Sequence, residues 1–150
     1  MMKNIFVIFG ILMLVATSFA RPAIDSYMEA RYDNVECWAD YADNLYDTIQ
    51  TYYTDAGQTP PAYLQSQRET LWAEGGLMYT LNSYMMMDNR VAFDSQVPVN
   101  MAYIFSMSRS FRTEARYVFT QGWETRADVI SDYSAMRSTL VSCLQPVAPG

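Results

Sequence analysis

The chain has 150 residues, of which 16 are acidic, 10 are basic and 51% are hydrophobic, and it contains no histidine. This composition is typical of a single globular domain and excludes a disordered, collagenous or multi-span membrane protein. The lack of histidine also excludes an imidazole base and a histidine-ligated zinc site.

The amino-terminal segment has the pattern of a secretory signal peptide. Lys3 supplies a positive charge, an apolar run over residues 5–15 follows, and small residues precede a cleavage position after Ala20. We therefore expect a signal peptide over residues 1–20 and a secreted, extracellular mature chain over residues 21–150, forming one helical domain with a short carboxy-terminal tail. No later apolar run approaches the length of a membrane span, so no membrane insertion is expected after signal removal.

The mature chain is acidic, because Lys3 is the only lysine and nine arginines remain against 16 acidic residues, for a net charge of −7. Such a charge disfavours nucleic acid and anionic lipid surfaces as partners. Without lysine or histidine, the mature chain also lacks the usual Schiff-base nucleophile and general base. We expect a protein that is not an enzyme and needs no cofactor and no metal.

The first predicted helix covers residues 25–54, without an internal proline or glycine, and Gly57 follows as a candidate C-cap. Its apolar residues recur at helical spacing and predict a buried face. These residues are Trp38, Tyr41, Ala42, Leu45, Ile49, Tyr52 and Tyr53.

An acidic stripe runs along the opposite side of this helix. It comprises Asp25, Glu29, Asp33, Glu36, Asp40, Asp43 and Asp47. One interpretation is a solvated face opposite the core. The other is a weak cation site or a docking surface for an extracellular protein with a basic surface, with Asp33, Glu36, Asp40, Asp43 and Asp47 as candidate partner-binding residues. A dedicated calcium site is not expected, because a straight helix cannot wrap several oxygens around one ion.

The next helical pattern starts with Thr59 as N-cap and Pro60 at the first position, and extends to about Asp88. Leu64, Leu71, Met78 and Met85 fall near one face. Gly75 and Gly76 leave open whether this region is one helix or two. Met85, within a run of three methionines, either fills a gap in the core or forms part of an adaptable binding wall.

Residues 91–99 contain Pro98 and are predicted to form a loop, and residues 100–121 to form the next helix. Arg109, Arg112 and Arg116 flank its apolar stripe. They either pair with the acidic stripe or clamp an anionic group, for which guanidinium geometry is suited.

The last predicted helix covers residues 123–144, with Ile130, Tyr133, Leu140 and Leu144 at helical spacing. Arg126 and Arg137 fall on the same stripe, which would direct two charges toward the core. Such arginines either extend their charge to solvent or meet a buried carboxylate or a ligand acid. Arg126, Arg137, Tyr133 and Met85 are therefore the candidate ligand-binding residues.

Cys37 and Cys143 are the only cysteines, and an even pair in an extracellular chain predicts a disulfide. Such a bridge would close a loop of about 100 residues, for which the chain-entropy model gives roughly 4–5 kcal/mol of stabilisation. The combined patterns predict an all-α protein, a compact antiparallel bundle of four or five helices tied by one disulfide.

These features favour a secreted, non-enzymatic binding protein that holds a small apolar or amphipathic ligand in an aromatic and methionine-lined space between helices. The alternative is an extracellular protein-interaction or structural factor that acts through its acidic face or its tyrosines. A continuous cavity favours the first function, and a filled core with exposed aromatic residues favours the second.

Overall fold

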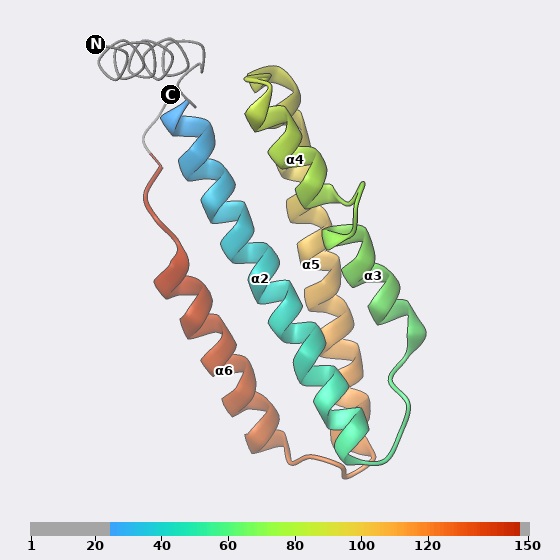
Figure 1. Cartoon of the computed structure of the whole chain (residues 1–150). Helices are drawn as coiled ribbons and strands as arrows, with labels where there is room; N and C mark the ends of the chain where they lie inside the picture. Colours follow the sequence, from blue (N-terminus) through green and yellow to red (C-terminus); the bar gives the residue numbers. More distant parts are fainter. Residues whose placement is uncertain (1–24, 148–150) are drawn as a thin grey trace, which may run out of the picture.

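The computed structural model describes residues 25–147. The helices are α2 (Ser26–Asp55), α3 (Ala62–Trp72), α4 (Leu77–Met86), α5 (Arg90–Thr120) and α6 (Arg126–Cys143). The chain descends along α2, returns along α3 and α4 as one interrupted arm, descends along α5 and returns along α6 (Figure 1). The predicted all-α antiparallel bundle is confirmed. The predicted signal peptide and its cleavage position lie outside the described residues.

Helix α2 is the central element and packs against α3, α4, α5 and α6. Its amino terminus is capped by the Asp25 carboxylate, which accepts a hydrogen bond from the backbone N–H of Tyr27 at 2.8 Å. The predicted apolar face is buried, apart from a partly exposed Trp38. Val35 and Tyr46 are buried as well, because neighbouring helices cover more than one face of α2.

The segment that returns between α2 and α5 is two helices, which settles the alternative that Gly75 and Gly76 left open in the sequence. Gly75 has a φ of +79°, and a Cβ on Gly76 would lie 2.7 Å from two backbone carbonyl oxygens. The predicted start at Thr59 and Pro60 is wrong, because α3 begins at Ala62. A residue that precedes proline is disfavoured in the helical conformation, so the Pro60–Pro61 pair delays the helix.

The predicted loop over residues 91–99 is also wrong, because this segment forms the first turns of α5. Asn89 caps the helix by accepting a hydrogen bond from the backbone N–H of Ala92 at 3.2 Å. Phe93 and Val97 are buried and hold the segment against the core. Pro98 lies inside the helix on its exposed side, where solvent can replace the hydrogen bond that proline removes.

Helix α6 is the least embedded, and its buried face differs from the predicted one. Only Met136 and Leu140 are buried within it, whereas Ile130 and Tyr133 are 53% and 38% exposed. The predicted stripe through Arg126 and Arg137 therefore does not face the core, and both arginines are exposed.

Covalent and polar contacts hold α6 against α2. The predicted disulfide between Cys37 and Cys143 is confirmed, and it ties the last residue of α6 to α2. The Asn34 side chain exchanges two hydrogen bonds with the Gln145 backbone, at 2.7 and 2.8 Å. The Tyr52 hydroxyl donates a hydrogen bond of 2.6 Å to the carboxylate of Asp132. None of the described helices is long and apolar enough to cross a membrane.

Candidate functional site

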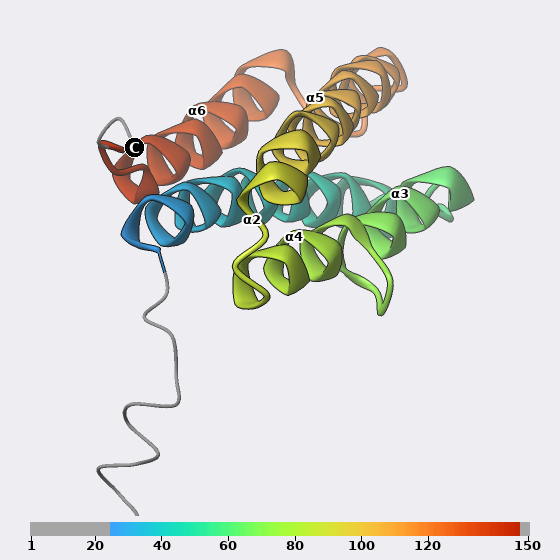
Figure 2. The same ribbon diagram turned by 90° about the horizontal axis from the view of Figure 1, so that it is seen from above.

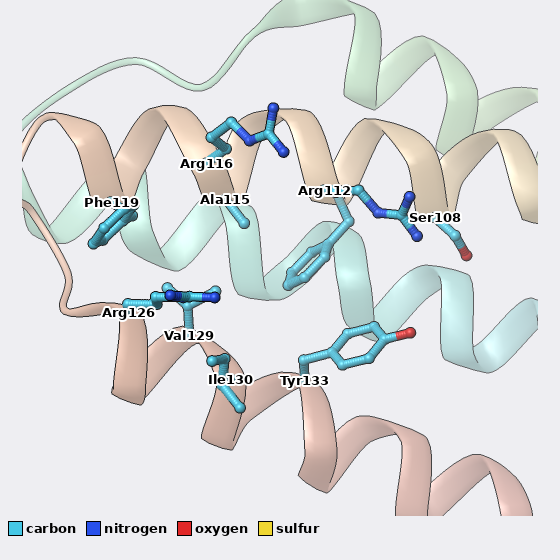
Figure 3. Close-up of a pocket in the computed structure, with 10 residues that line it drawn as sticks. Ser108, Arg112, Ala115, Arg116, Phe119, Arg126, Val129, Ile130 and Tyr133 are labelled. Atoms are coloured by element: carbon cyan, nitrogen blue, oxygen red, sulfur yellow. The ribbon is translucent and has the colours of Figure 1, made fainter.

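A hollow of about 470 Å³ lies between α5 and α6. Seen from above, α5 begins next to α4 and crosses α2, so that its carboxy-terminal half lies on the same side of α2 as α6 (Figure 2). Because α5 and α6 touch each other sparsely, the space between them stays partly open. This α5–α6 groove is lined by Ser108, Phe111, Arg112, Ala115, Arg116 and Phe119 of α5 and by Arg126, Val129, Ile130 and Tyr133 of α6 (Figure 3).

The groove combines a buried apolar base with exposed apolar walls. Phe111 and Ala115 are each 5% exposed, whereas Phe119, Ile130 and Tyr133 are 43%, 53% and 38% exposed. The rings of Phe111 and Tyr133 stack with their centroids 5.9 Å apart and so join the two helices. A ligand in the groove would cover Phe119, Ile130 and Tyr133 without displacing the core.

Three arginines and no carboxylate are among the residues that line the groove. Arg112 and Arg116 are four residues apart on α5, and Arg126 projects from α6. Arg126 lies between the two helices, Arg112 runs along α5, and the guanidinium group of Arg116 points away from α6 (Figure 3). None of these three guanidinium groups forms an ion pair with another residue in the part of the chain that the structure describes. The groove is therefore cationic as well as apolar.

The acidic stripe lies elsewhere and has its own arginine. Nε of Arg68 in α3 lies 2.7 Å from the Asp43 carboxylate, and its NH1 lies 3.6 Å from that of Asp47. The guanidinium carbon also lies 4.8 Å from the centre of the Tyr46 ring. The predicted pairing of Arg109, Arg112 and Arg116 with this stripe is thus wrong, because α3 supplies the counter-charge.

The candidate partner-binding carboxylates differ in their surroundings. Burial raises the pKa of Glu36, and repulsion from Asp40 and Asp33 adds to the effect. Burial also raises the pKa of Asp40 and Asp43, and for Asp43 the nearby Arg68 opposes the shift. The stripe is therefore not a purely solvated face.

The structure brings together two of the four predicted ligand-binding residues. Arg126 and Tyr133 line the α5–α6 groove. Arg137 instead lines a separate shallow hollow on α6, and Met85 is buried in α4 away from both hollows. Helical spacing indicates Arg109, Arg112 and Arg116 as a candidate anion clamp, but no pattern in the sequence places Arg126 at the same hollow as Arg112 and Arg116.

A second polar cluster lies inside the bundle, around Glu114 of α5. The carboxylate of this buried residue accepts hydrogen bonds from the hydroxyl groups of Tyr53, at 2.6 Å, and Tyr63. Both tyrosines have a raised pKa, caused first by burial and then by the bond to Glu114. The cluster is satisfied internally, so it joins α2, α3 and α5 rather than forming an open site.

Comparison of the chain with protein-family models, with curated proteins and with solved structures finds no match. The described residues define the class of the protein as a disulfide-linked all-α bundle. The functional argument therefore rests on the groove itself. Among the described residues, no group of three histidine, cysteine, aspartate or glutamate side chains is arranged to hold a metal ion.

Proposed function

We propose that the protein is a secreted, non-enzymatic binding protein that accepts a small apolar or amphipathic ligand in the α5–α6 groove. The observation that carries the proposal is the concentration of exposed Phe119, Ile130 and Tyr133 around one hollow between two helices. Exposed apolar side chains that gather in a concave site are typical of binding surfaces. The volume of about 470 Å³ falls within the range of roughly 300–1,000 Å³ for small-molecule sites.

Secretion is supported by the signal-peptide pattern of residues 1–20 and by the Cys37–Cys143 disulfide, since disulfides persist in oxidising compartments. A non-catalytic role is supported by the chemistry of the groove. Its polar side chains are those of arginine, serine and tyrosine, with no carboxylate or cysteine among the lining residues. This set can bind and orient a ligand but contains no group suited to act as a general base near neutral pH.

The alternative, a protein-interaction factor that acts through its acidic face, receives less support. Asp43 and Asp47 are engaged by Arg68, which leaves Asp33, Glu36 and Asp40 as the available carboxylates. The tyrosines are divided: Tyr63, Tyr79, Tyr117 and Tyr133 are exposed, whereas most of those in α2 lie in the core. Tyr41, Tyr46, Tyr52 and Tyr53 are all buried.

Binding of the neutral fluorescent probe phenyl-naphthylamine tests the proposed function. The wild-type protein should enhance its fluorescence, and Ile130→Gln and Phe119→Gln should each weaken binding. Each change removes apolar contact worth about 1–2 kcal/mol, or roughly tenfold in affinity. Because both side chains are largely exposed, the substitutions should leave the fold intact.

Val99→Gln is the matched control, because Val99 is a 50% exposed residue of α5 that does not line the groove. It should bind the probe as the wild type does. The proposal fails if the wild-type protein does not bind the probe, or if all three variants bind it equally.

A further inference from the structure

We propose that the ligand of the α5–α6 groove is an anionic amphiphile, a small molecule with an apolar body and one oxyanionic head, and that Arg112, Arg116 and Arg126 bind the head. This inference rests on the proposed function and adds the charge of the ligand. Its first support is the contrast between these arginines and those elsewhere in the bundle.

Within residues 25–147, the three arginines nearest the amino terminus all have carboxylate partners. Arg31 lies 2.6 Å from Asp94, Arg68 lies 2.7 Å from Asp43, and Arg90 lies 3.8 Å from Asp94. In the second half of α5 and in α6, no arginine of the described chain forms an ion pair. These are Arg109, Arg112, Arg116, Arg126 and Arg137.

Three of the arginines without ion pairs gather at a single hollow, although the mature chain carries an excess of acidic residues. Arg112 and Arg116 are neighbours on one helical face, and like charges at this spacing repel. An anion bound between them and Arg126 would relieve that repulsion. It would also supply the planar acceptor that guanidinium groups recognise through paired hydrogen bonds.

The apolar and charged side chains of the groove are separated in the way that the two parts of an amphiphile are. Ala115 and the neighbouring Phe111 form the apolar base, and Val129 and Ile130 form the apolar wall of α6. Arg126 lies between the two helices beside these residues, Arg112 runs along α5, and Arg116 projects from α5 away from α6 (Figure 3). An apolar body can therefore lie on the base while the acid group remains at the mouth, among the arginines that line the groove.

The size of the hollow favours a small molecule over a docked helix. One turn of helix, about 5.4 Å long and roughly 10 Å across, occupies about 400 Å³. The hollow of about 470 Å³ therefore accommodates only about one turn. A longer acidic segment, or an anionic membrane surface, would also meet the repulsion of an acidic protein, whereas a single small anion meets little of it.

Two probes with the same aromatic skeleton separate the charge from the apolar contact. Anilinonaphthalene sulfonate carries a sulfonate, and phenyl-naphthylamine does not. The wild-type protein should bind the sulfonate at least about tenfold more tightly than the neutral probe, as expected for a hydrogen bond to a charged group. Added salt should weaken only the binding of the sulfonate.

Arg112→Met and Arg126→Met should each remove most of this preference while leaving binding of the neutral probe unchanged, because methionine keeps an apolar stem. Arg109→Met is the matched control, since it removes the same charge from α5 at a position that does not line the groove. It should keep the wild-type preference. Dodecanoate should displace the sulfonate probe, and dodecanol should displace it much less well.

The possible failures are distinguishable. If the neutral probe binds but the sulfonate binds no better, or if all three arginine variants behave alike, the anionic head is wrong and the proposed function stands. If neither probe binds, both are wrong. Displacement by an acidic amphipathic peptide or by phosphatidylglycerol vesicles, but not by dodecanoate, would also overturn the assignment to a small anion.

Discussion

Arginine has opposite surroundings on the two sides of helix α2. On the α3 side, Arg68 lies between two carboxylates of the acidic stripe and over an aromatic ring. On the other side, Arg112, Arg116 and Arg126 surround an apolar hollow in which no carboxylate is a lining residue. The difference comes from what the facing helix offers, because α3 faces the acidic stripe of α2 whereas α5 and α6 present arginines to one another. The unpaired set is therefore the one available to a ligand.

The two sides also differ in how they are packed. In α3, Leu64 and Leu71 are at most 1% exposed, although this helix is short. The longer α6 buries only Met136 and Leu140 and depends on its disulfide and polar contacts. A helix held at its end and along one edge can leave a groove beside it. The groove is thus a consequence of the incomplete burial of α6.

The largest expected effect follows from releasing α6. Replacing both Cys37 and Cys143 with serine should lower the free energy of unfolding by roughly 4–5 kcal/mol, because the bridge closes a loop of about 100 residues. It should also weaken binding of phenyl-naphthylamine, since one wall of the groove loses its covalent attachment. Urea unfolding followed by circular dichroism measures the first effect. An unchanged unfolding midpoint would show that noncovalent contacts alone hold α6.

Truncation of the α2 core should have the next largest effect. Leu45→Ala or Ile49→Ala should cost about 2–5 kcal/mol, because both side chains are fully buried between α2 and its neighbours. Asp40→Asn on the acidic stripe should change stability little. Thermal melts of the three variants measure the difference, and equal losses would contradict the assigned faces of α2.

Arginine substitutions on the two sides of α2 should differ modestly but measurably. Arg68→Met removes a partly exposed ion pair and should cost about 0.2–1 kcal/mol of stability. Arg112→Met removes no ion pair and should leave stability unchanged while lowering affinity for anilinonaphthalene sulfonate. Chemical unfolding and probe titration on the same two proteins test both expectations. A larger loss of stability at Arg112 would mean that it has a structural role.

The smallest effect concerns Glu36, whose pKa is raised in the folded protein, first by burial and then by its acidic neighbours. A raised folded pKa means that ionisation of Glu36 opposes folding near pH 7. This penalty is lost as the pH falls through the folded pKa toward the unfolded value. Glu36→Gln should therefore stabilise the protein slightly near pH 7 and have no effect below about pH 4. Melting temperatures at the two pH values test this, and a loss of stability near pH 7 would reverse the sign.

The parts of the fold that depend on local pattern were predictable from the sequence. The buried face of α2 and the disulfide follow from spacing and residue type, whereas Gly75 and Gly76 left open whether one helix or two would form. The start of α5 does not follow from the local pattern, because Pro98 favours a loop, whereas the Asn89 cap and the buried Phe93 and Val97 hold the segment helical.

The candidate site was predictable only in part. Arg126 and Tyr133 were identified, but on the expectation that their stripe faces the core, whereas Met136 and Leu140 form the buried face. The apolar residues of α6 are spread around the helix, so periodicity did not select the correct side. Arg112, Arg116 and Arg126 line one groove because of how α5 and α6 both pack on α2. Local sequence patterns do not predict this packing.

The most direct test of ligand binding in the groove uses isoleucine methyl groups as reporters in a nuclear magnetic resonance titration with dodecanoate. Ile130 lies in the groove and is 53% exposed, whereas Ile49 and Ile104 are fully buried in the core. The account predicts that the methyl signal of Ile130 shifts and saturates while those of Ile49 and Ile104 stay nearly fixed. An unmoved Ile130 signal, or equal shifts at all three positions, would contradict it.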